Sequence, residues 1–418
     1  MSRRVPVLLT ALLAAAAVSA GRAAAEPDLF SRETIGGVVD LRAAAADGER
    51  SWTDGGFGKL RYGADGGGFE GEAALAEASL VWRPQLSWEL SGVVTALHHP
   101  EQEHGIDLSE AYLAYRPTPR SETRFSVRAG LFWPHISLEH DDVAWGVTRS
   151  ITPSAINSWV GEEVKVVGLE ASVRREVAGH ALEATGGLFG GNDTSGTLLT
   201  FRGWALHDIK STAFGSFDLP PLSPFMQTRQ APVTDPLWEI DGRAGHYFQL
   251  AWTPPGPAAF NAFYYDNNGD PEAVRDLQWG WRTRFWNLGA RIDPDDKTVV
   301  LAQAMWGSTK MGFPTADGIW TDVDFRAAYL LVSRSVGQGL VTGRLDLFEV
   351  EDRSLQALDD NAETGWSAMA AYRRPIGKHL VCLVEALHVN SDRPSRSLAG
   401  LPAQQDQTTV QTALRVVF

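Results

Sequence analysis

The sequence lacks long hydrophobic runs and almost lacks cysteine. Beyond the first 25 residues, no stretch offers about 18 consecutive apolar residues, which argues against membrane-spanning helices. Cys382 is the single cysteine, so an intramolecular disulfide is impossible. If the chain crosses a membrane, it must do so with strands, because every backbone polar group has to be satisfied there.

Signatures of catalysis and nucleotide binding are missing as well. The sequence contains no GxSxG, HExxH or GxxxxGK[ST] pattern. We therefore expect no enzyme and no cofactor. Histidines and acidic residues do gather around His98, His99 and His104 and again around His135 and His140. Their spacing matches no known ligand set, so we expect no metal site.

Basic residues are also scarce. The formal net charge is −14, and the lysines number only six, dispersed along the chain at Lys59, Lys165, Lys210, Lys297, Lys310 and Lys378. Phosphate backbones reward clustered lysine and arginine, so this balance excludes nucleic acid as a partner.

What is present begins with an export signal. Arg3 and Arg4 precede an apolar stretch at 5–17 and the small residues 23–25. This order is typical of a cleaved secretory signal, and the apolar stretch is too short for a spanning helix. We expect residues 1–25 to be removed and the mature chain to begin near Glu26.

The last strand carries the strongest signal. Val410, Thr412, Leu414, Val416 and Phe418 share one face of an alternating segment that ends the printed sequence on an aromatic residue. An alternating strand with a terminal aromatic resembles the closing strand of an outer-membrane β-barrel. That resemblance implies an assembly signal formed by Phe418, Val416 and Leu414, recognised by the barrel assembly machinery.

Alternation recurs along the chain in about sixteen segments, separated in turn by short and long connections, as in an antiparallel transmembrane barrel of a Gram-negative outer membrane. Eighteen strands are an alternative, because the long outer loop 190–245 contains an apolar run at Leu198–Trp204. The expected strands are 33–42, 71–83, 86–98, 107–116, 122–132, 162–174, 180–189, 246–254, 258–266, 276–292, 297–307, 322–335, 340–350, 363–373, 378–390 and 406–418.

Within these segments one face is apolar and the other carries charges of both signs. In 122–132, for example, Phe125 and Val127 oppose Arg124, Ser126 and Arg128. A dry core could not hold such charges unpaired, so we expect a water-filled lumen. The other expected lumen residues are Glu89, Glu110, Arg282, Arg284, Arg326, Arg344 and Asp346.

The segment 130–139 resembles a run of the phosphate-selective porin family of O and P type. Gly130, Phe132, Pro134, Leu138 and Glu139 carry the likeness. The resemblance implies sixteen strands, a homotrimer, and a third outer loop, 133–161, that folds inward to narrow the pore. The same loop could instead cap the barrel from outside. Family members line the channel with lysine and arginine, whereas this chain mixes both signs, so phosphate specificity does not carry over.

These features favour a porin in outer-membrane lipid that lets small polar solutes or anions diffuse passively, with a weak anion preference set by Arg124 and Arg128. Two other readings remain open. Long outer loops, above all 190–245, could make the barrel a receptor or an enzyme. A secreted all-β carbohydrate-binding protein would show similar alternation.

Overall fold

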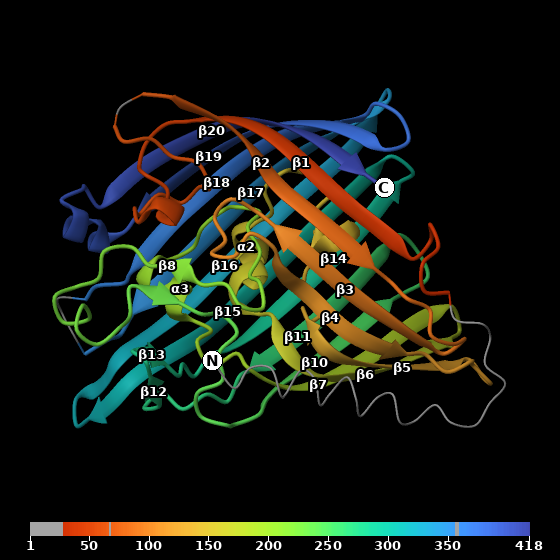
Figure 1. Ribbon diagram of the computed structural model, residues 1–418, viewed down its shortest axis with the longest axis horizontal. Helices are drawn as coiled ribbons and strands as arrows, with labels where there is room; N and C mark the ends of the chain where they lie inside the picture. Colours follow the sequence, from red (N-terminus) through yellow and green to blue (C-terminus); the bar gives the residue numbers. More distant parts are fainter. Residues whose placement is uncertain (1–27, 67, 356–358) are drawn as a thin grey trace.

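Sixteen antiparallel strands close into one barrel (Figure 1). The computed structural model describes residues 28–66, 68–355 and 359–418. The expected signal at 1–25 lies outside the described residues. Each strand pairs with its neighbour along the chain, and β20 returns to pair with β1. The predicted fold class is therefore confirmed.

The barrel strands are β1 (Ile35–Ala46), β2 (Glu70–Trp82), β3 (Leu90–His98), β4 (Asp107–Tyr115), β5 (Thr123–Phe132), β6 (Val166–Val177), β7 (His180–Gly190), β10 (Gly245–Thr253), β11 (Ala258–Asp266), β14 (Arg284–Asp295), β15 (Thr298–Thr315), β16 (Gly318–Val336), β17 (Gly339–Asp352), β18 (Glu363–Pro375), β19 (Leu380–Asp392) and β20 (Gln404–Val417). The loops contain α2 (Ala155–Glu163), α3 (Thr197–Phe201), the 3-10 turns η1 (Trp52–Asp54), η2 (Val143–Trp145) and η3 (Pro394–Ala399), and the short pairs β8 (Phe217–Asp218) with β9 (Val233–Thr234) and β12 (Val274–Arg275) with β13 (Gln278–Trp279).

Every predicted strand overlaps an observed one, and the two largest errors are at 276–292, where β14 begins only at Arg284, and at 297–307, where β15 continues to Thr315. The eighteen-strand alternative is wrong, because Leu198–Trp204 supplies helix α3 instead of a strand. A short apolar run has no periodicity that separates a buried strand from a buried helical turn.

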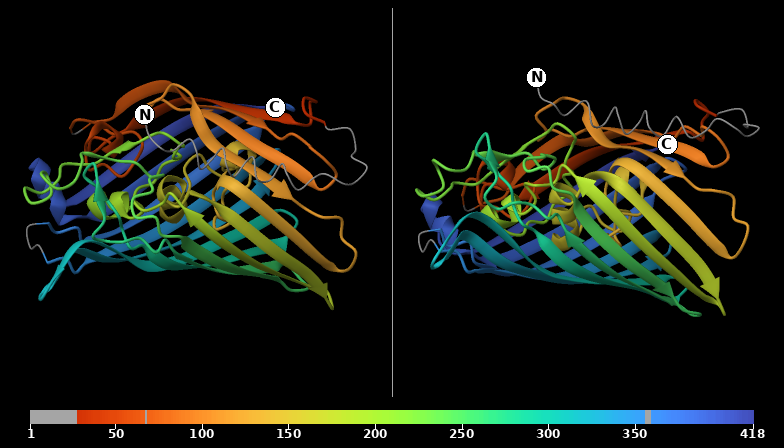
Figure 2. Two further views of the ribbon diagram at one scale, coloured as in Figure 1. Left: turned by 60° about the horizontal axis from the view of Figure 1, so that its bottom comes forward. Right: turned by 90° about the horizontal axis from the view of Figure 1, so that it is seen from below.

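Long and short connections lie at opposite ends of the barrel. In Figure 1 the turns at the right are short, whereas α3, β8 and the β12–β13 pair crowd the left end. Figure 2 shows the same loops gathered at one end and reaching inside the wall. The described residues hold no helix that is both long and apolar enough to cross a membrane.

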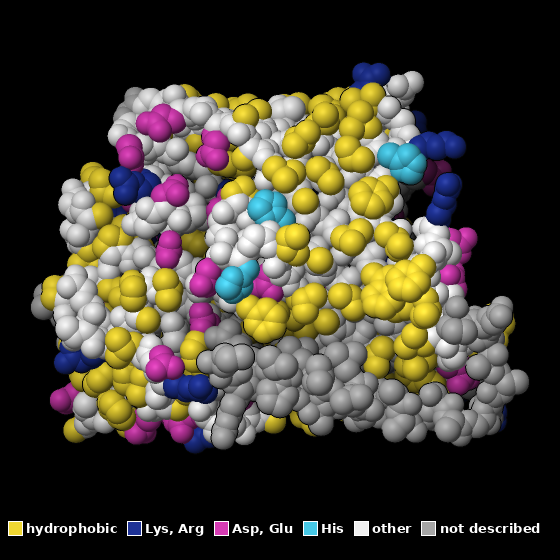
Figure 3. Space-filling view, in the orientation of Figure 1, with side chains coloured by type: hydrophobic (Ala, Val, Ile, Leu, Met, Phe, Trp, Pro, Cys, Tyr) yellow, Lys and Arg dark blue, Asp and Glu magenta, His cyan; other side chains and the backbone are white. Residues whose placement is uncertain are grey.

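The outer wall is apolar. Leu345 and Leu347 of β17 are 60% and 64% exposed, while Arg344 and Asp346 between and beside them are buried. Figure 3 shows hydrophobic side chains spread over the front of the barrel wall, with charged side chains toward its two ends. Outward leucine and inward charge on one strand is the arrangement that lipid outside the wall requires.

The interior differs from the water-filled lumen that we expected. Phe285, Phe325 and Phe348 point inward from the wall and join a large apolar cluster with Trp159 of α2 and Trp204 of the loop 190–245. Trp159 lies 5.3 Å from the rings of both Phe285 and Phe325. Apolar residues occur on both faces of these strands, and only the fold shows that the inner ones are covered by loops.

The barrel closes at a tight contact between β1 and the last residue. Gly37 and Phe418 exchange two backbone hydrogen bonds, at 2.9 and 3.1 Å. A Cβ on Gly37 would lie 2.5 Å from the carbonyl oxygen of Ser79 and 2.7 Å from the Phe418 ring, so glycine is needed at this position. Phe418, Val416 and Leu414 are all exposed on the outer face of the barrel.

We expect deletion of Phe418 to lower the folded yield strongly, because β20 loses its terminal aromatic and its last bonds to Gly37. Deletion of one residue from the exposed tip at 315–318, between β15 and β16, is the control. Folded protein is counted as the fraction that migrates faster before boiling in SDS. Equal yields from the two variants would refute a role of Phe418 in assembly.

Candidate functional site

The loop between β5 and β6 crosses the inside of the barrel. Inward-facing wall residues hold it by hydrogen bonds: Gln249 donates to the His135 carbonyl at 2.7 Å, and Gln303 donates to that of Ile136 at 2.9 Å. On the opposite wall, Glu385 accepts from the Ile151 amide at 2.6 Å. Every residue of α2 is buried. The loop therefore narrows the lumen and does not cap it from outside.

Glu139, the last residue of the family-like run, braces this loop. It is 3% exposed and accepts hydrogen bonds from the Ser154 amide at 3.0 Å and the Asn157 amide group at 2.5 Å. Arg344 of the wall approaches it at 3.3 Å and also donates to the Thr152 carbonyl at 2.7 Å. Glu139 thus joins both ends of the inner segment to β17.

The other residues of the run have structural places. Gly130 has a φ of 138°, and a Cβ there would lie 2.2 Å from the Ala111 carbonyl oxygen. Phe132 is fully buried beneath the Arg128 guanidinium, 4.0 Å from its ring centre. Pro134 lies directly after β5, and the Leu138 amide donates to Gln303 at 3.1 Å.

The loop 190–245, expected to extend outside the cell, enters the lumen over its first half. Residues 192–213 are almost all buried, and Trp204 packs 6.0 Å from Trp159. Arg202 forms an ion pair with Glu162 at 2.5 Å, and His207 approaches the same carboxylate at 2.9 Å. This pairing satisfies charges that burial would otherwise make very costly.

Glu163 at the end of α2 holds the two inner loops together. It accepts hydrogen bonds from the Trp159 indole at 2.7 Å and from the amides of Leu198 and Gly196 at 2.9 and 3.2 Å. Burial raises the pKa of Glu163 to about 7, although these donors favour its charged form. The contact between the loops therefore includes a group that titrates near neutral pH.

We expect this carboxyl to make stability pH-dependent. Its folded pKa of about 7 lies above the ordinary value of 4.5, so its contribution is fully present below about pH 4.5 and is lost as the pH rises through 7. The difference corresponds to about 3 kcal/mol. Urea unfolding of wild type and Glu163→Gln across this range measures it. Parallel pH profiles of the two proteins would contradict the assignment.

Between the inner loops and the wall of β1, β2 and β20 lies a small cavity of about 30 Å³, lined by six charged side chains as well as apolar ones. Its lining combines Asp40, Glu77 and Arg415 of the wall with Asp142 of the first inner loop and Asp208 and Lys210 of the second. Such a volume holds about one or two water molecules. We call this cavity the constriction and take it as the candidate functional site.

Ion pairs connect the barrel wall to the loops at the constriction. Asp40 pairs with Arg42 and Arg415, each at 2.7 Å, and Arg42 also reaches Asp208 at 2.7 Å. Arg61 from the first outer loop meets Asp208 at 2.9 Å. Although burial opposes it, Arg42 and Arg61 hold the pKa of Asp208 well below its ordinary value. Asp208 therefore stays charged and anchors its loop to the wall.

A second pair closes the other side of the cavity. Lys210 meets Glu77 of β2 at 2.8 Å and donates to the Ala144 carbonyl at 2.9 Å. Because Lys210 and Asp208 share one segment, the loop 190–245 contributes a charge of each sign to the lining of this cavity.

The arginine track predicted on β5 is placed inward, but its charges are not equally available. Arg128 forms a bidentate pair with Glu170 at 2.7 and 2.9 Å and is 8% exposed. Arg124 is exposed near the short-turn end, directly opposite Arg174 of β6. Ser126 lies between them, opposite Ser172.

The two predicted acids lie at different places. Glu110 lies on β4, directly opposite the buried Thr95 of β3. Glu89 precedes β3 and accepts hydrogen bonds from the Thr118 amide at 3.0 Å and the Tyr115 hydroxyl at 3.3 Å. It ties two neighbouring turns together at the short-turn end of the barrel.

Two of the predicted lumen arginines are on the wrong face. Arg284 and Arg326 are exposed on the outer side, on the same strand faces as Leu288 and Leu330. β16 has 19 residues, more than the roughly 9–11 that span a bilayer, so its outer end can carry outward charge beyond the lipid. Arg282 precedes β14 and pairs with Asp266 at 3.0 Å.

Arg344 and Asp346 do face inward, where they form a buried pair at 2.8 Å. Sequence reasoning missed Asp40, Arg42, Arg415, Asp208 and Lys210. The alternation of β1 and β20 could have indicated the three wall residues. Nothing local in the sequence shows that 208–210 meets them, because a 56-residue loop has many possible paths.

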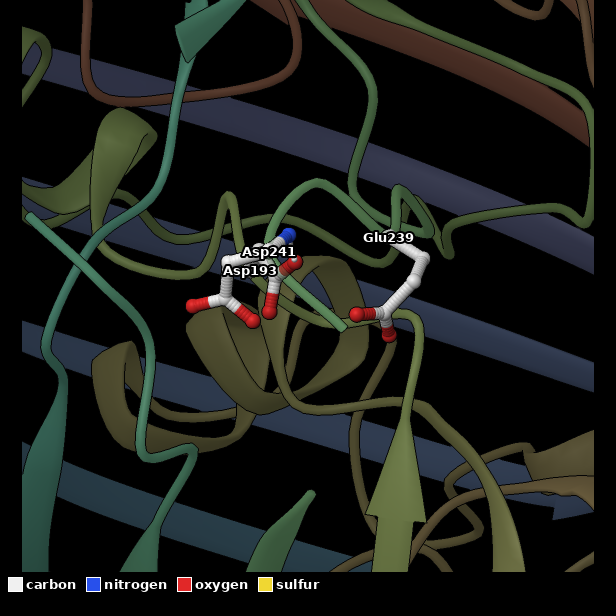
Figure 4. A group of neighbouring side chains, drawn as sticks. All are labelled: Asp193, Glu239 and Asp241. Carbon is white, nitrogen blue, oxygen red and sulfur yellow. Dashed lines mark hydrogen bonds between the residues drawn. The ribbon is translucent and has the colours of Figure 1, made fainter. Parts of the chain in front are cut away.

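Three carboxylates gather at the two ends of the loop 190–245. Figure 4 shows Asp193, Glu239 and Asp241, whose oxygens lie within 4.8 Å of one another. Backbone amides occupy them: Ile240 donates to Asp193 at 2.5 Å, and Gly191 to Glu239 at 2.6 Å. The three carboxylates therefore join the two ends of the loop 190–245.

Comparison with known proteins places the fold. No protein-family model matches the sequence, and no curated protein matches it. Among solved structures, the chain is similar to an anion-selective porin from Comamonas acidovorans (TM-score 0.52, 12% identity, 94% of this chain and 100% of that one). It is also similar to the outer membrane channel DcaP of Acinetobacter baumannii (0.53, 10%, 95% and 99%) and to the trimer form of OmpT, an outer membrane protein of Vibrio cholerae (0.52, 8%, 92% and 99%). The chain thus has the fold of outer-membrane porins.

Proposed function

We propose that this protein is an outer-membrane porin of narrow bore, through which small polar solutes and ions diffuse passively. The observation that carries the proposal is the constriction, where charges of both signs from β1, β2 and β20 face the two inner loops. Polar lining lowers the cost of passing a hydrated solute, and the width of the passage sets the size limit. The porin fold of the structural neighbours supports the same function.

A weak preference for anions is the finer part of this proposal. Arg128 is closely paired with Glu170, so the preference falls to Arg124 and its neighbour Arg174, which share one face near the short-turn mouth. Arg174 has only the more distant carboxylates of Glu176 and Glu183, at 3.8 and 3.9 Å, and both of its partners are at least partly exposed. Guanidinium groups stay ionised and bind phosphate or carboxylate oxygens well. The neighbour from Comamonas acidovorans is described as anion-selective. We make no proposal of phosphate specificity.

We also propose that the protein is exported by cleavage of residues 1–25, folded by the barrel assembly machinery and assembled as a homotrimer. The apolar outer wall supports the membrane location, and one structural neighbour is described in a trimer form. Chemical cross-linking of the protein in outer-membrane vesicles tests the trimer.

Single-channel recording of the folded protein in a planar bilayer tests the channel. We expect discrete conductance steps, and in a dilute salt gradient a reversal potential on the anion side that shifts toward zero in Arg124→Gln/Arg174→Gln. Arg334→Gln is the control, because Arg334 lies on the outer face of β16, away from the lumen. Absence of conductance refutes the channel, whereas unchanged reversal potentials refute only the anion preference.

A further inference from the structure

The outer wall carries a polar groove that the channel does not use. It lies across β11 and β14–β17, has a volume of about 520 Å³ and opens to the surroundings of the barrel. Its lining includes Arg284, Arg326 and Arg353 together with the aromatic rings of Trp286 and Trp306. The two tryptophans are 45% and 43% exposed.

The strand register fixes the height of this groove on the wall. Leu288, Ala304, Ala328 and Leu347 face one another across β14–β17 and form an apolar row. Two residues farther toward the long loops, the next row is Trp286, Trp306, Arg326 and Glu349, and the row after it is Arg284, Ser308, Asp324 and Glu351. The wall thus changes from apolar to aromatic to charged within about 13 Å along each strand.

An outward-facing arginine on β16 marks the lower border of the apolar band. Arg334 faces outward eight residues after Arg326, and the outward residues between them are Ala328, Leu330 and Val332. Eight residues span about 26 Å along a strand, which is about 20 Å along the membrane normal at a tilt of about 40°. This is about 5 Å less than the height of the apolar band of such barrels, a difference that the long arginine side chains can bridge. Arg326 therefore lies at the level where the acyl chains of the outer leaflet end and its headgroups begin.

The arginines of the groove still have N–H donors available to a ligand at this level. Arg326 uses its Nε and Nη2 on a single oxygen of Glu349, at 2.8 and 2.6 Å, and its side chain is 69% exposed. Arg284 forms no ion pair within the described residues, and its nearest partner is the Ser308 hydroxyl at 3.5 Å. Arg353 pairs with Asp324 at 2.7 Å and is 53% exposed. Each guanidinium has five N–H donors, so several remain for an incoming anion.

We infer that this groove binds the phosphorylated sugar headgroup of a glycolipid in the surrounding outer leaflet. Phosphate oxygens match the forked donors of Arg284 and Arg326, and a sugar ring fits against the exposed faces of Trp286 and Trp306. The acyl chains of the same molecule then lie along the apolar row below. Asp324, Glu349 and Glu351 hold Arg326 and Arg353 in position, and they balance the charge of the three arginines when the groove is empty.

Native mass spectrometry with bis-phosphorylated lipid A as the probe tests this inference. We expect Arg284→Gln/Arg326→Gln/Arg353→Gln to weaken lipid A binding by about tenfold or more, the loss expected for at least one charge-assisted hydrogen bond. The matched control is Arg334→Gln, which removes an outward arginine at the other end of β16. Since all four arginines are exposed, the variants should fold, and migration before boiling in SDS verifies it.

Two further probes identify the ligand. Fully dephosphorylated lipid A should bind the wild-type protein about tenfold more weakly. Inorganic phosphate should not displace the lipid, because it lacks the acyl chains. The inference is overturned if the triple variant binds lipid A like the wild type, if dephosphorylation has no effect, or if inorganic phosphate competes. It is also overturned if the triple variant changes the oligomeric state and not lipid binding, since the groove would then be covered by a second copy. None of these results depends on conductance.

Discussion

Single-channel conductance should rise several-fold when residues 196–213 are replaced by a glycine and serine segment of equal length. This replacement removes Trp204 from the apolar cluster and removes both Asp208 and Lys210 from the constriction. Without these contacts, too little interaction energy remains to offset the conformational entropy that the segment loses when it is ordered inside the lumen. The segment should leave the lumen, and the cross-section open to ions should grow accordingly.

The control is the same treatment of the exposed residues 315–317 at the tip between β15 and β16, which should leave conductance unchanged. A milder variant, Asp208→Ala/Lys210→Ala, keeps Trp204 in place and should give a smaller increase. All proteins are first checked for migration before boiling. If folded protein with the replaced segment conducts like the wild type, the loop does not limit the passage.

The largest loss of stability is expected from Arg344→Met. The guanidinium is fully buried and meets Asp346 at 2.8 Å, Glu139 at 3.3 Å and the Thr152 carbonyl at 2.7 Å. Removing it leaves two buried carboxylates without their cation, which costs about 3–5 kcal/mol. Because Glu139 and Thr152 belong to the inner loop, the variant should also loosen that loop from β17 and make the open channel noisier.

Urea unfolding followed by tryptophan fluorescence measures this loss. Arg334→Met is the control, because Arg334 pairs with Asp295 at 3.0 Å where both side chains are about half exposed. Such a pair contributes about 0–1 kcal/mol. Equal free energies of unfolding for the two variants would show that the Arg344 network does not hold the inner loop.

The faces of several strands could be predicted from the sequence, and so could the site of barrel closure. Period-two alternation placed Arg344 and Asp346 inside and Leu345 and Leu347 outside, as the structure has them. Alternation also put Leu414, Val416 and Phe418 on one face of the last strand, and the structure shows that this face is the outer one. These predictions succeed because successive side chains of a strand point to opposite faces and lipid accepts only apolar groups over the spanning part.

The same rule fails where a strand extends beyond the membrane. Arg326 and Arg284 were assigned inward because they are charged, yet both lie outward beyond the apolar band. Trp133 and Tyr265 lie near strand ends, where aromatic side chains of such barrels often meet the membrane interface, yet both are buried inside the barrel. Polarity alone does not tell how far along a strand the lipid ends.

The sequence by itself determined an antiparallel barrel of about sixteen strands, because strand alternation and turn length are local properties of the chain. Only the tertiary structure decided what fills that barrel. Asp208 meets Arg42 and Arg61, and Trp204 meets Trp159, across separations that no local pattern encodes. Loop closure costs little more entropy for a long loop than for a short one, so the path of the loop 190–245 is set by the side chains that receive it inside the wall.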